Sequence, residues 1–386
     1  MRPLVKNLLL LTVLAGFVLY LGRRYPEIAR GTDFPDFYAA ARMVHQGAGH
    51  ELYSAAAQRE FQIRYTGRVG TYFIHPPFET LLYLPLAHWP MERAYLLWSL
   101  LNVGLLVVAT RVTARHMAPG RDWQLLAAGM LMFAPVLLSF IQGQDSLLLL
   151  LLLVLAFAAL KRDQPLLAGA LLACGLFKFH LVVPIAVIFL FGRRWKVLCG
   201  FTAVAALLGL VSVAISGWGW FAAYARFLSE LTALPMAGIH PEEMANLRGL
   251  VALLSPAAAW MTLTMACTLV VLGWAIWSCN RGGTELGIAN AVLAATLVSY
   301  HLSPHDLSVL LLPMVLILRQ VWTASAPKWL RRIQGATIVI LFLPPLHLFL
   351  LSRHVYGYAG VLTIILFFAT SAEMYRVPGS EHRARS

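Results

Sequence analysis

The sequence predicts an all-α polytopic membrane protein, because it is rich in apolar residues, poor in charged ones and divided into long apolar runs. Hydrophobic residues make up 60% of the 386 positions, charged residues make up 12%, and the mean hydropathy is +0.73. The run Leu147–Leu155 is apolar at every position, whereas a strand of a transmembrane barrel would alternate. We therefore expect a single integral membrane domain that covers residues 1–386.

About twelve segments approach the roughly 20 apolar residues that a membrane-spanning helix needs. The first, Leu8–Leu21, has no small-residue cleavage site before Arg23, so we interpret it as an uncleaved span and not as a signal peptide. The other expected spans are 92–112, 123–141, 145–160, 164–179, 181–192, 197–216, 255–278, 285–300, 306–320, 333–351 and 357–375. The fold class is therefore a bundle of about twelve transmembrane helices.

Two long polar stretches interrupt this pattern. Residues 23–75 form a first loop, in which Phe37–Val44 and Ser54–Tyr65 have helical composition and are expected to lie at the membrane surface. Residues 217–249 form a second large loop. The apolar piece 75–89 is short and contains proline, which favours a re-entrant or interfacial segment over a span.

The distribution of basic residues predicts the orientation. The net charge of +13 does not indicate nucleic-acid binding, because the basic residues form short clusters between apolar runs, as topology signals do. With a cytoplasmic N-terminus, every short connection rich in lysine or arginine faces the cytoplasm. These connections contain Arg111, Arg115, Arg121, Lys161, Arg162, Arg193, Arg194, Lys196, Arg281, Arg319, Lys328, Arg331, Arg332 and Arg376.

The same orientation gathers acids, histidines and amides on the outer side. Polar groups that converge on one face of a helical bundle predict an extracytoplasmic active site or binding cavity. The residues concerned are Asp33, Asp36, His75, Gln142, Gln144, Asp145, Lys178, His180, His240, Glu242, Glu243, Arg248, His301, His305, Asp306, Arg353 and His354.

Asp33 and Asp36 lie in the stretch Gly31–Met43, directly after the first apolar segment. A carboxylate there can act as a general base if a substrate hydroxyl comes within hydrogen-bond reach. The alternative for Asp33 is that it caps a helix through Phe34–Val44. Asp36 is expected to be the first-turn acid of that helix, or a residue that supports Asp33.

Gln144 and Asp145 stand where one expected span ends and the next begins, so a site role and a helix-capping role remain open. Lys178 and His180 flank Phe179 at an expected short outer turn. A lysine there is a point charge suited to a phosphate, or it extends to the membrane interface.

The outer turn from His301 to Asp306 contains a second group of polar residues. His301 and His305 have the spacing of one helical face, although Pro304 disfavours a regular helix. Three roles remain open for the turn: binding of a leaving phosphate, a hydrogen-bonded structural pair, and metal binding. Arg248 and Arg353 are further outer cations that bind phosphate or anchor the interface.

The segment Asp33–Tyr53, DFPDFYAAARMVHQGAGHELY, resembles the first-loop signature of glycosyltransferase family 87, within the GT-C superfamily of membrane glycosyltransferases. Further pieces are similar in the same order, although Phe37 and Ser146 differ from the family pattern. These pieces are HPPF at His75–Phe78, Gly143–Leu148, Lys178 and the turn His301–Asp306.

The resemblance implies an inverting hexosyltransferase, expected to be a mannosyltransferase, with a polyprenyl-phosphate sugar as donor and co-substrate. Asp33 matches the position that serves as catalytic base in related enzymes. Donor-phosphate contacts are expected from Lys178, His180, Arg248, His301, His305 and Arg353, and substrate-contacting or supporting positions are expected at Asp36, Tyr38, His75, Gln144, Asp145 and Asp306.

The expected partners are the lipid-linked donor, a glycolipid or glycan acceptor and membrane lipid, with no nucleic acid, no cofactor and no obligatory metal. The expected location is the bacterial inner (plasma) membrane, with the active site on the extracytoplasmic side. A twelve-helix secondary transporter is the alternative, although no internal repeat is evident and the ionisable residues lie at span ends.

Overall fold

The computed structural model describes residues 32–118, 122–231, 240–255, 259–279, 284–323 and 326–376, with a few positions between residues 7 and 23. All regular structure in these ranges is helical, and they contain no strand. The expected first span, Leu8–Leu21, lies outside the continuously described residues.

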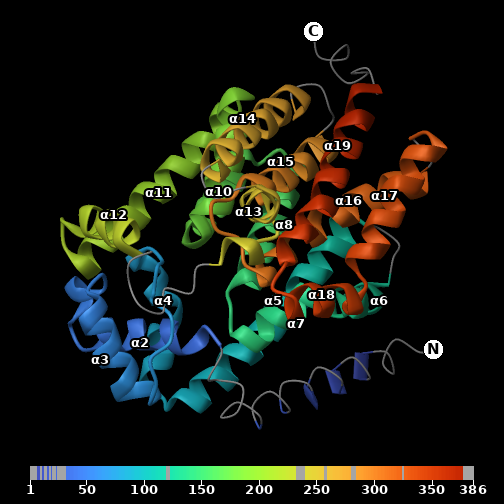
Figure 1. The fold of residues 1–386 in the computed structure, drawn as a ribbon. Coiled ribbons are helices and arrows are strands. Elements are labelled where there is room, and N and C mark those ends of the chain that lie inside the picture. Colours follow the sequence, from blue (N-terminus) through green and yellow to red (C-terminus); the bar gives the residue numbers. More distant parts are fainter. Residues whose placement is uncertain are drawn as a thin grey trace. The chain divides into compact units, whose positions relative to one another are not determined.

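Figure 1 shows the helices in chain order. The α-helices are α2 (Phe34–His45), α3 (Ala55–Thr66), α4 (Thr80–Tyr83), α5 (Met91–His116), α6 (Trp123–Met132), α7 (Ala134–Gln142), α8 (Ser146–Lys161), α9 (Pro165–Cys174), α10 (Phe179–Phe191), α11 (Trp195–Ser216), α12 (Trp220–Glu230), α13 (Leu247–Leu254), α14 (Trp260–Cys279), α15 (Thr284–Val298), α16 (Leu311–Thr323), α17 (Lys328–Leu341), α18 (Pro344–Ser352) and α19 (Ala359–Arg376). The 3₁₀ turns are η2 (Gly49–Glu51), η3 (Pro77–Glu79), η4 (Leu84–His88), η5 (Gly175–Lys178), η7 (Pro241–Glu243), η8 (Pro304–Leu310) and η9 (Tyr356–Tyr358).

The described residues contain six helical stretches long and apolar enough to cross a membrane, or eight if two bent pairs each count as one span. The six are Met91–His116, Pro165–Phe191, Trp195–Ser216, Trp260–Cys279, Pro304–Trp322 and Tyr356–Met374. The bent pairs are α6 with α7, at 74°, and α17 with α18, at 60°. The expected spans 145–160 and 285–300 correspond to the shorter apolar helices α8 and α15. Within the described residues, length and composition therefore give six to eight spans, and the expected first span lies outside these residues.

Every residue of the stretch Pro165–Phe191 belongs to an α-helix or a 3₁₀ turn, yet the chain bends sharply within this stretch. A Cβ at Gly200 would lie 2.0 Å from the carbonyl oxygen of Leu166, so the start of α11 packs on the start of α9. A straight helix would place Leu166 about 37 Å from Phe191, whereas the chain from Phe191 to Gly200 reaches at most about 22 Å. The bend falls at η5, so Lys178 lies at a turn, as the sequence predicts.

Contacts between backbone positions divide the chain into two compact units, each assembled from separate segments. Unit 1 comprises residues 1–107, 139–145 and 203–239, and unit 2 comprises residues 108–138, 146–202 and 240–386.

In unit 1, the two helices expected in the first loop are present as α2 and α3, which pack against each other. Helix α3 begins at Ser54, whose side chain accepts a hydrogen bond from the Ala57 amide, and it ends at Gly67 with φ +71°. Both ends follow from sequence, because serine is a favoured N-cap and glycine adopts a left-handed conformation without strain. Helix α2 places nine residues in the core.

Aromatic rings pack between α2 and the helices α4 and α5. Phe34 packs edge-on against Tyr95, with ring centroids 5.4 Å apart, and Phe37 stacks on Tyr83 at 4.8 Å. Tyr83 also packs against Trp98 at 4.3 Å. These contacts join α2 to the short helical turns of residues 77–88 and to α5. The packing of the rings therefore fixes the position of Phe34, the first residue of α2.

The segment 75–89, expected to be re-entrant or interfacial, consists of η3, α4 and η4 in succession. Its helical part covers residues 77–88, which is too short to cross a bilayer of about 30 Å.

In unit 2, α15 is buried along most of its length and packs against α10, α14, α16 and α19. Asn290, in the middle of α15, donates hydrogen bonds to Ser278 of α14 and Ser371 of α19. At the start of α15, Glu285 pairs with Lys161 at 2.6 Å and with Arg319 at 2.7 Å. These polar contacts fix the register of the apolar helices.

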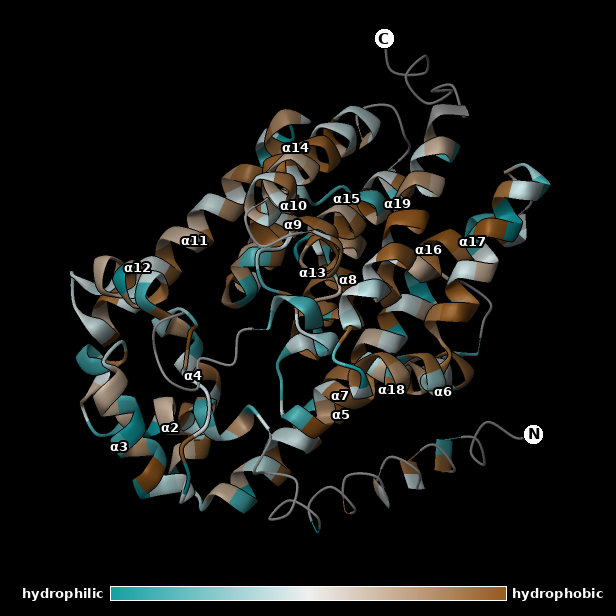
Figure 2. Ribbon diagram, viewed as in Figure 1, coloured by the Kyte–Doolittle hydropathy of each residue, from teal (hydrophilic) through white to brown (hydrophobic). Residues whose placement is uncertain are grey.

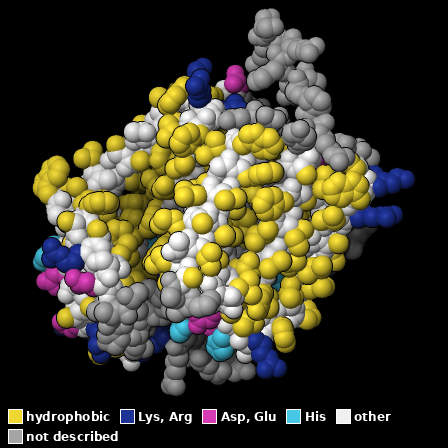
Figure 3. Space-filling model, turned by 45° about the horizontal axis from the view of Figure 1, so that its top comes forward, with side chains coloured by type: hydrophobic (Ala, Val, Ile, Leu, Met, Phe, Trp, Pro, Cys, Tyr) yellow, Lys and Arg dark blue, Asp and Glu magenta, His cyan; other side chains and the backbone are white. Residues whose placement is uncertain are grey.

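Apolar side chains cover much of the surface, as expected for a chain surrounded by lipid. In α11 and α14, Leu207, Leu210, Met265 and Leu269 are each at least 57% exposed. Figure 2 shows the hydrophobic colour along these helices, and Figure 3 shows hydrophobic side chains over most of one face, with charged groups at its margins.

Candidate active site

Asp33 is held by a single side chain from a distant part of the sequence. The Gln144 amide nitrogen Nε2 donates a hydrogen bond of 2.5 Å to Asp33 Oδ2, and both residues belong to unit 1. Gln144 is 4% exposed, whereas Asp33 is half-buried. Within the described residues, Oδ1 of Asp33 makes no hydrogen bond. The carboxylate therefore has one restrained oxygen and one available oxygen.

The capping alternative for Asp33 is not what the structure shows. Asp33 occupies the N-cap position of α2, but its side chain makes no capping hydrogen bond. The backbone carbonyl of Asp33 accepts the first bonds of the helix from Asp36 and Phe37, so the helix begins there without using the carboxylate. The carboxylate is thus not used for capping, and it accepts the hydrogen bond from Gln144 instead.

The turn that carries Gln144 depends on a glycine. Gly143 has φ +65°, and a Cβ there would lie 2.6 Å from the Cβ of Phe34, the residue after Asp33. Only glycine permits both the backbone conformation and this close approach. The Asn102 side chain also donates to the Gln144 carbonyl at 3.2 Å. The Gln144 side chain binds the Asp33 carboxylate, as a residue of the site would.

Asp145 lies in a buried acidic group together with Glu79, a residue that was not expected from the sequence. Asp145 and Glu79 are each 0% exposed, and the two carboxyl groups lie close enough for Asp145 to affect the pKa of Glu79. On its other side, Glu79 pairs with His75 Nδ1 at 2.8 Å. Burial raises the pKa of Glu79 to about 8; His75 opposes this shift and the Asp145 charge adds to it. At neutral pH, Glu79 is therefore mainly protonated, which avoids two adjacent buried carboxylate charges.

Tyr83 lies beside these acids. Its hydroxyl is buried and makes no hydrogen bond within the described residues. Burial raises its pKa well above the usual value, and the charges of Asp145, Glu79 and Asp33 add to the shift. Glu79 could have been found from sequence, because it follows His75 by one helical turn in the otherwise uncharged segment 76–87.

Asp36 is a structural residue in this geometry. It accepts hydrogen bonds from Thr71 Oγ1 at 2.6 Å and from Gln62 Nε2 at 3.0 Å, which fix α3 and the chain at Gly70 and Thr71 to α2. Burial raises the pKa of Asp36 to about 8. The structure confirms that it is an acid of the first turn of α2.

In unit 2, Lys178 and Asp306 form a buried ion pair. Lys178 Nζ lies 2.9 Å from Asp306 Oδ1, and the two residues are 2% and 1% exposed. Ser146 Oγ donates to the same oxygen at 3.0 Å, and His305 Nε2 lies 3.6 Å from it. The second oxygen of Asp306 accepts from the Ser303 amide. One carboxylate thus organises four of the surrounding polar groups.

His180 and His301 lie next to this pair. His180 Nδ1 is 2.8 Å from Ser299 Oγ, which donates to the His301 carbonyl at 2.6 Å, and the two rings meet edge to face at 6.1 Å. His301 precedes η8 and His305 lies inside it, so the two histidines do not share a regular helix face. The doubt raised by Pro304 is therefore justified.

Arg248 and Arg353 differ in their surroundings. Arg248 is 5% exposed, donates to the Tyr300 carbonyl at 2.9 Å and lies 4.2 Å from the centre of the Tyr300 ring. Arg353 is exposed and contacts Phe349. His354 pairs with Glu243 at 2.5 Å. No contact joins Arg353 to the Lys178–Asp306 pair among the described residues.

The described side chains therefore form two groups. In unit 1 they are Asp33 with Gln144, and Asp145 with Glu79 and His75. In unit 2 they are Lys178, His305 and Asp306, with His180 and His301 beside them. No three histidine, cysteine or acidic side chains in the described residues converge as metal ligands would.

The comparisons with known proteins give one match. The model of glycosyltransferase family 87 matches residues 73–304, well over half of the chain. This range includes Glu79, Gln144, Asp145 and Lys178, whereas Asp33 precedes it. No curated protein and no solved structure matches the chain significantly.

Proposed function

The chain belongs to glycosyltransferase family 87, and from this premise we propose that it transfers a hexose from a polyprenyl-phosphate donor to an envelope lipid or glycan. Asp33 serves as the general base in this proposal, and mannose is the first sugar to test. The observation that carries the proposal is the Asp33–Gln144 hydrogen bond, which restrains one carboxylate oxygen and leaves Oδ1 available.

In the proposed reaction, Oδ1 of Asp33 accepts the proton of an acceptor hydroxyl. The hydroxyl oxygen attacks the anomeric carbon from the face opposite the phosphate, and the bond from that carbon to the phosphate oxygen breaks. Its electron pair leaves with the polyprenyl phosphate, so the configuration inverts. A base within hydrogen-bond reach contributes about 10² to 10⁴ in rate.

Gln144 supports this role because an amide orients a carboxylate without supplying a charge. A cation at the same place would stabilise the ionised form and make Asp33 a weaker base. The half-exposed position of Asp33 also allows an acceptor to approach.

The leaving phosphate gains negative charge, which pre-placed donors stabilise. We assign this role to Lys178, His180, Arg248, His301, His305 and Arg353, with unequal weight. Lys178 is already compensated by Asp306, so its net contribution is smaller than that of a free cation. The imidazoles of His180 and His301 are half-buried and offer neutral or charged donors.

The same proposal includes a GT-C arrangement with about twelve spans, a location in a bacterial plasma membrane and an extracytoplasmic active site. The charge distribution of the connections supports the orientation in this proposal. Family membership disfavours the rival secondary transporter, which shares only the number of spans.

The test uses the purified protein in lipid nanodiscs with an envelope lipid extract as acceptor. Labelled polyprenyl-phosphate mannose and labelled GDP-mannose are supplied in separate reactions, and the products are analysed by mass spectrometry and NMR. We expect transfer only from the lipid-linked donor, with an inverted anomeric centre. Transfer only from GDP-mannose, or a retained configuration, would contradict the proposal; solute uptake into vesicles without a glycosyl product would favour the transporter.

A further inference from the structure

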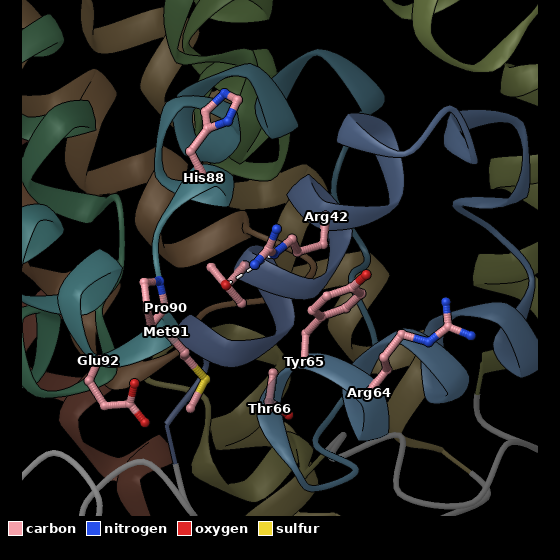
Figure 4. A pocket seen from close by; sticks show the side chains of 9 residues that line it. Arg42, Arg64, Tyr65, Thr66, His88, Pro90, Met91 and Glu92 are labelled. Atoms are coloured by element: carbon pink, nitrogen blue, oxygen red, sulfur yellow. Dashed lines mark hydrogen bonds between the residues drawn. The ribbon is translucent and has the colours of Figure 1, made fainter.

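An open cleft of about 510 Å³ lies in unit 1, within the usual size range of ligand sites. Figure 4 shows the side chains that line it, which come from α2, α3, η4 and the start of α5. They are Tyr38, Arg42, Arg64, Tyr65, Thr66, His88, Pro90, Met91 and Glu92. Most of these side chains carry a polar group, so the cleft suits a ligand rich in hydrogen-bonding groups.

Arg42 is the central group of the cleft, and its orientation is fixed from two sides. Its Nε donates to the Tyr38 hydroxyl at 3.1 Å, and that hydroxyl donates to the Trp89 carbonyl at 2.7 Å. The guanidinium carbon lies 4.6 Å from the centre of the Tyr65 ring. Because Nε and the flat face are occupied, the terminal Nη groups are the ones left to bind a ligand.

The charge of Arg42 has no acidic partner within 4 Å among the described residues, although the side chain is half-buried. Arg64, at the other side of Tyr65, pairs with Glu60 at 2.8 Å on α3 and is exposed. A rigid guanidinium whose charge is not compensated binds phosphate through two parallel hydrogen bonds. The arrangement therefore favours an anion at Arg42.

The remaining polar groups favour hydroxyls beside that anion. Glu92 lies at the opposite end of the cleft from Arg64 and supplies acceptors, while Thr66 and His88 supply groups that donate or accept. A simple inorganic anion would leave these groups unused. A head group that combines phosphate with several hydroxyls would engage both ends.

We propose that this cleft binds a phosphate-bearing polyhydroxyl head group, with the phosphate on Arg42 and the hydroxyls toward Glu92. Tyr38 then acts by orienting Arg42 and not by touching the sugar that reacts at Asp33. The identification of this head group as part of the acceptor rests on the proposed function, whereas its binding does not.

The experiment measures binding of mannose 6-phosphate to the full-length protein in detergent, by saturation-transfer NMR and calorimetry, with no donor present. Mannose and inorganic phosphate are titrated separately. We expect mannose 6-phosphate to bind at least tenfold more tightly than either. Equal affinity for mannose and mannose 6-phosphate would overturn the proposal.

Substitutions locate the site. Arg42→Gln is expected to weaken binding of mannose 6-phosphate at least tenfold, and Arg64→Gln about threefold. Arg59→Gln is the matched control, because Arg59 is exposed on α3 but does not line the cleft. Arg64→Gln changes an exposed residue and keeps the test available if Arg42→Gln does not fold. Unchanged binding by both folded cleft variants would overturn the assignment.

Two further arms identify the source of the head group and separate this proposal from catalysis. Displacement of mannose 6-phosphate by phosphatidylglycerol nanodiscs would assign the head group to a lipid. No displacement would assign it to a glycan or a soluble molecule. Either result upholds the site if the Arg42 and Arg64 variants bind as stated above. Asp33→Asn is expected to bind mannose 6-phosphate like the wild type. Binding lost in Asp33→Asn but kept in Arg42→Gln would refute the cleft.

Discussion

The Gln144 side-chain amide donates a hydrogen bond of 2.5 Å to the carboxylate of Asp33, across 111 positions of the sequence. This contact distinguishes Asp33 from Asp36, three residues later, whose two oxygens both accept hydrogen bonds from neighbouring structure. The two acids of one helical turn thus have different surroundings, and within the described residues only Asp33 has a carboxylate oxygen that accepts no hydrogen bond.

Gln144→Leu is expected to lower kcat about tenfold to a hundredfold, with little change in KM for the donor. A hydrogen bond to a charged group contributes about 1.5 to 3 kcal/mol, and each 1.4 kcal/mol corresponds to tenfold in rate. Gln142→Leu is the matched control, since Gln142 lies in the same connection and makes no hydrogen bond to Asp33. Equal losses in the two variants would remove the special role of Gln144.

Lys178→Met is expected to destabilise the protein by about 3 to 5 kcal/mol, because it leaves the buried Asp306 carboxylate without its partner. The double variant Lys178→Met with Asp306→Asn is expected to recover most of the thermal stability, measured as the Tm in detergent. If Lys178 also contacts the donor phosphate, the double variant folds but transfers sugar slowly. Full activity in the stable double variant would restrict Lys178 to a structural role.

The stability of the protein is expected to fall as the pH rises through about 8. Burial raises the pKa of Asp36 from 3.8 to about 8, so the folded state binds a proton more tightly than the unfolded state. This contribution is fully present below about pH 4 and is lost as the pH rises through about 8. Asp36→Asn is expected to flatten the dependence of Tm on pH between 5 and 9. An unchanged slope in this variant would exclude Asp36 as its source.

Glu79→Gln is expected to preserve sugar transfer at alkaline pH. Glu79 has a pKa of about 8, so at higher pH it becomes a second carboxylate against Asp145 and the two repel. The wild-type rate is therefore expected to decline above pH 8, while glutamine keeps a neutral donor at that place. The rates are compared from pH 6 to 9.5. A decline of the same size in the variant would show that another group causes it.

Much of the helical pattern could be predicted from the sequence, because long apolar runs and helix caps are local signals. The expected spans 92–112, 197–216 and 357–375 correspond to α5, α11 and α19 within a few residues. The turn at Lys178 is also present. The number of spans in the described residues does not follow from apolar length alone, because α8 and α15 are apolar but short, and α6 with α7 and α17 with α18 form bent pairs.

The contacts of the candidate site could not be predicted in the same way. The hydrogen bond from Gln144 to Asp33 joins residues whose approach depends on Gly143 lying against Phe34, a tertiary packing detail without a local signal. Lys178 was interpreted as a phosphate-binding charge or a lysine that extends to the membrane interface, yet it forms an ion pair with Asp306. Glu79 was not predicted as a site residue because the segment 75–89 was interpreted from its hydropathy, and a single acid changes the mean hydropathy of a segment only slightly.

The central claim, that Asp33 is the general base, is tested most directly by the single-turnover rate of Asp33→Asn with labelled polyprenyl-phosphate mannose. Asparagine has nearly the same shape as aspartate and cannot accept the proton, so we expect the rate to fall at least a thousandfold while the donor still binds and the Tm stays close to that of the wild type. A folded Asp33→Asn protein that transfers the sugar within tenfold of the wild-type rate would contradict the account.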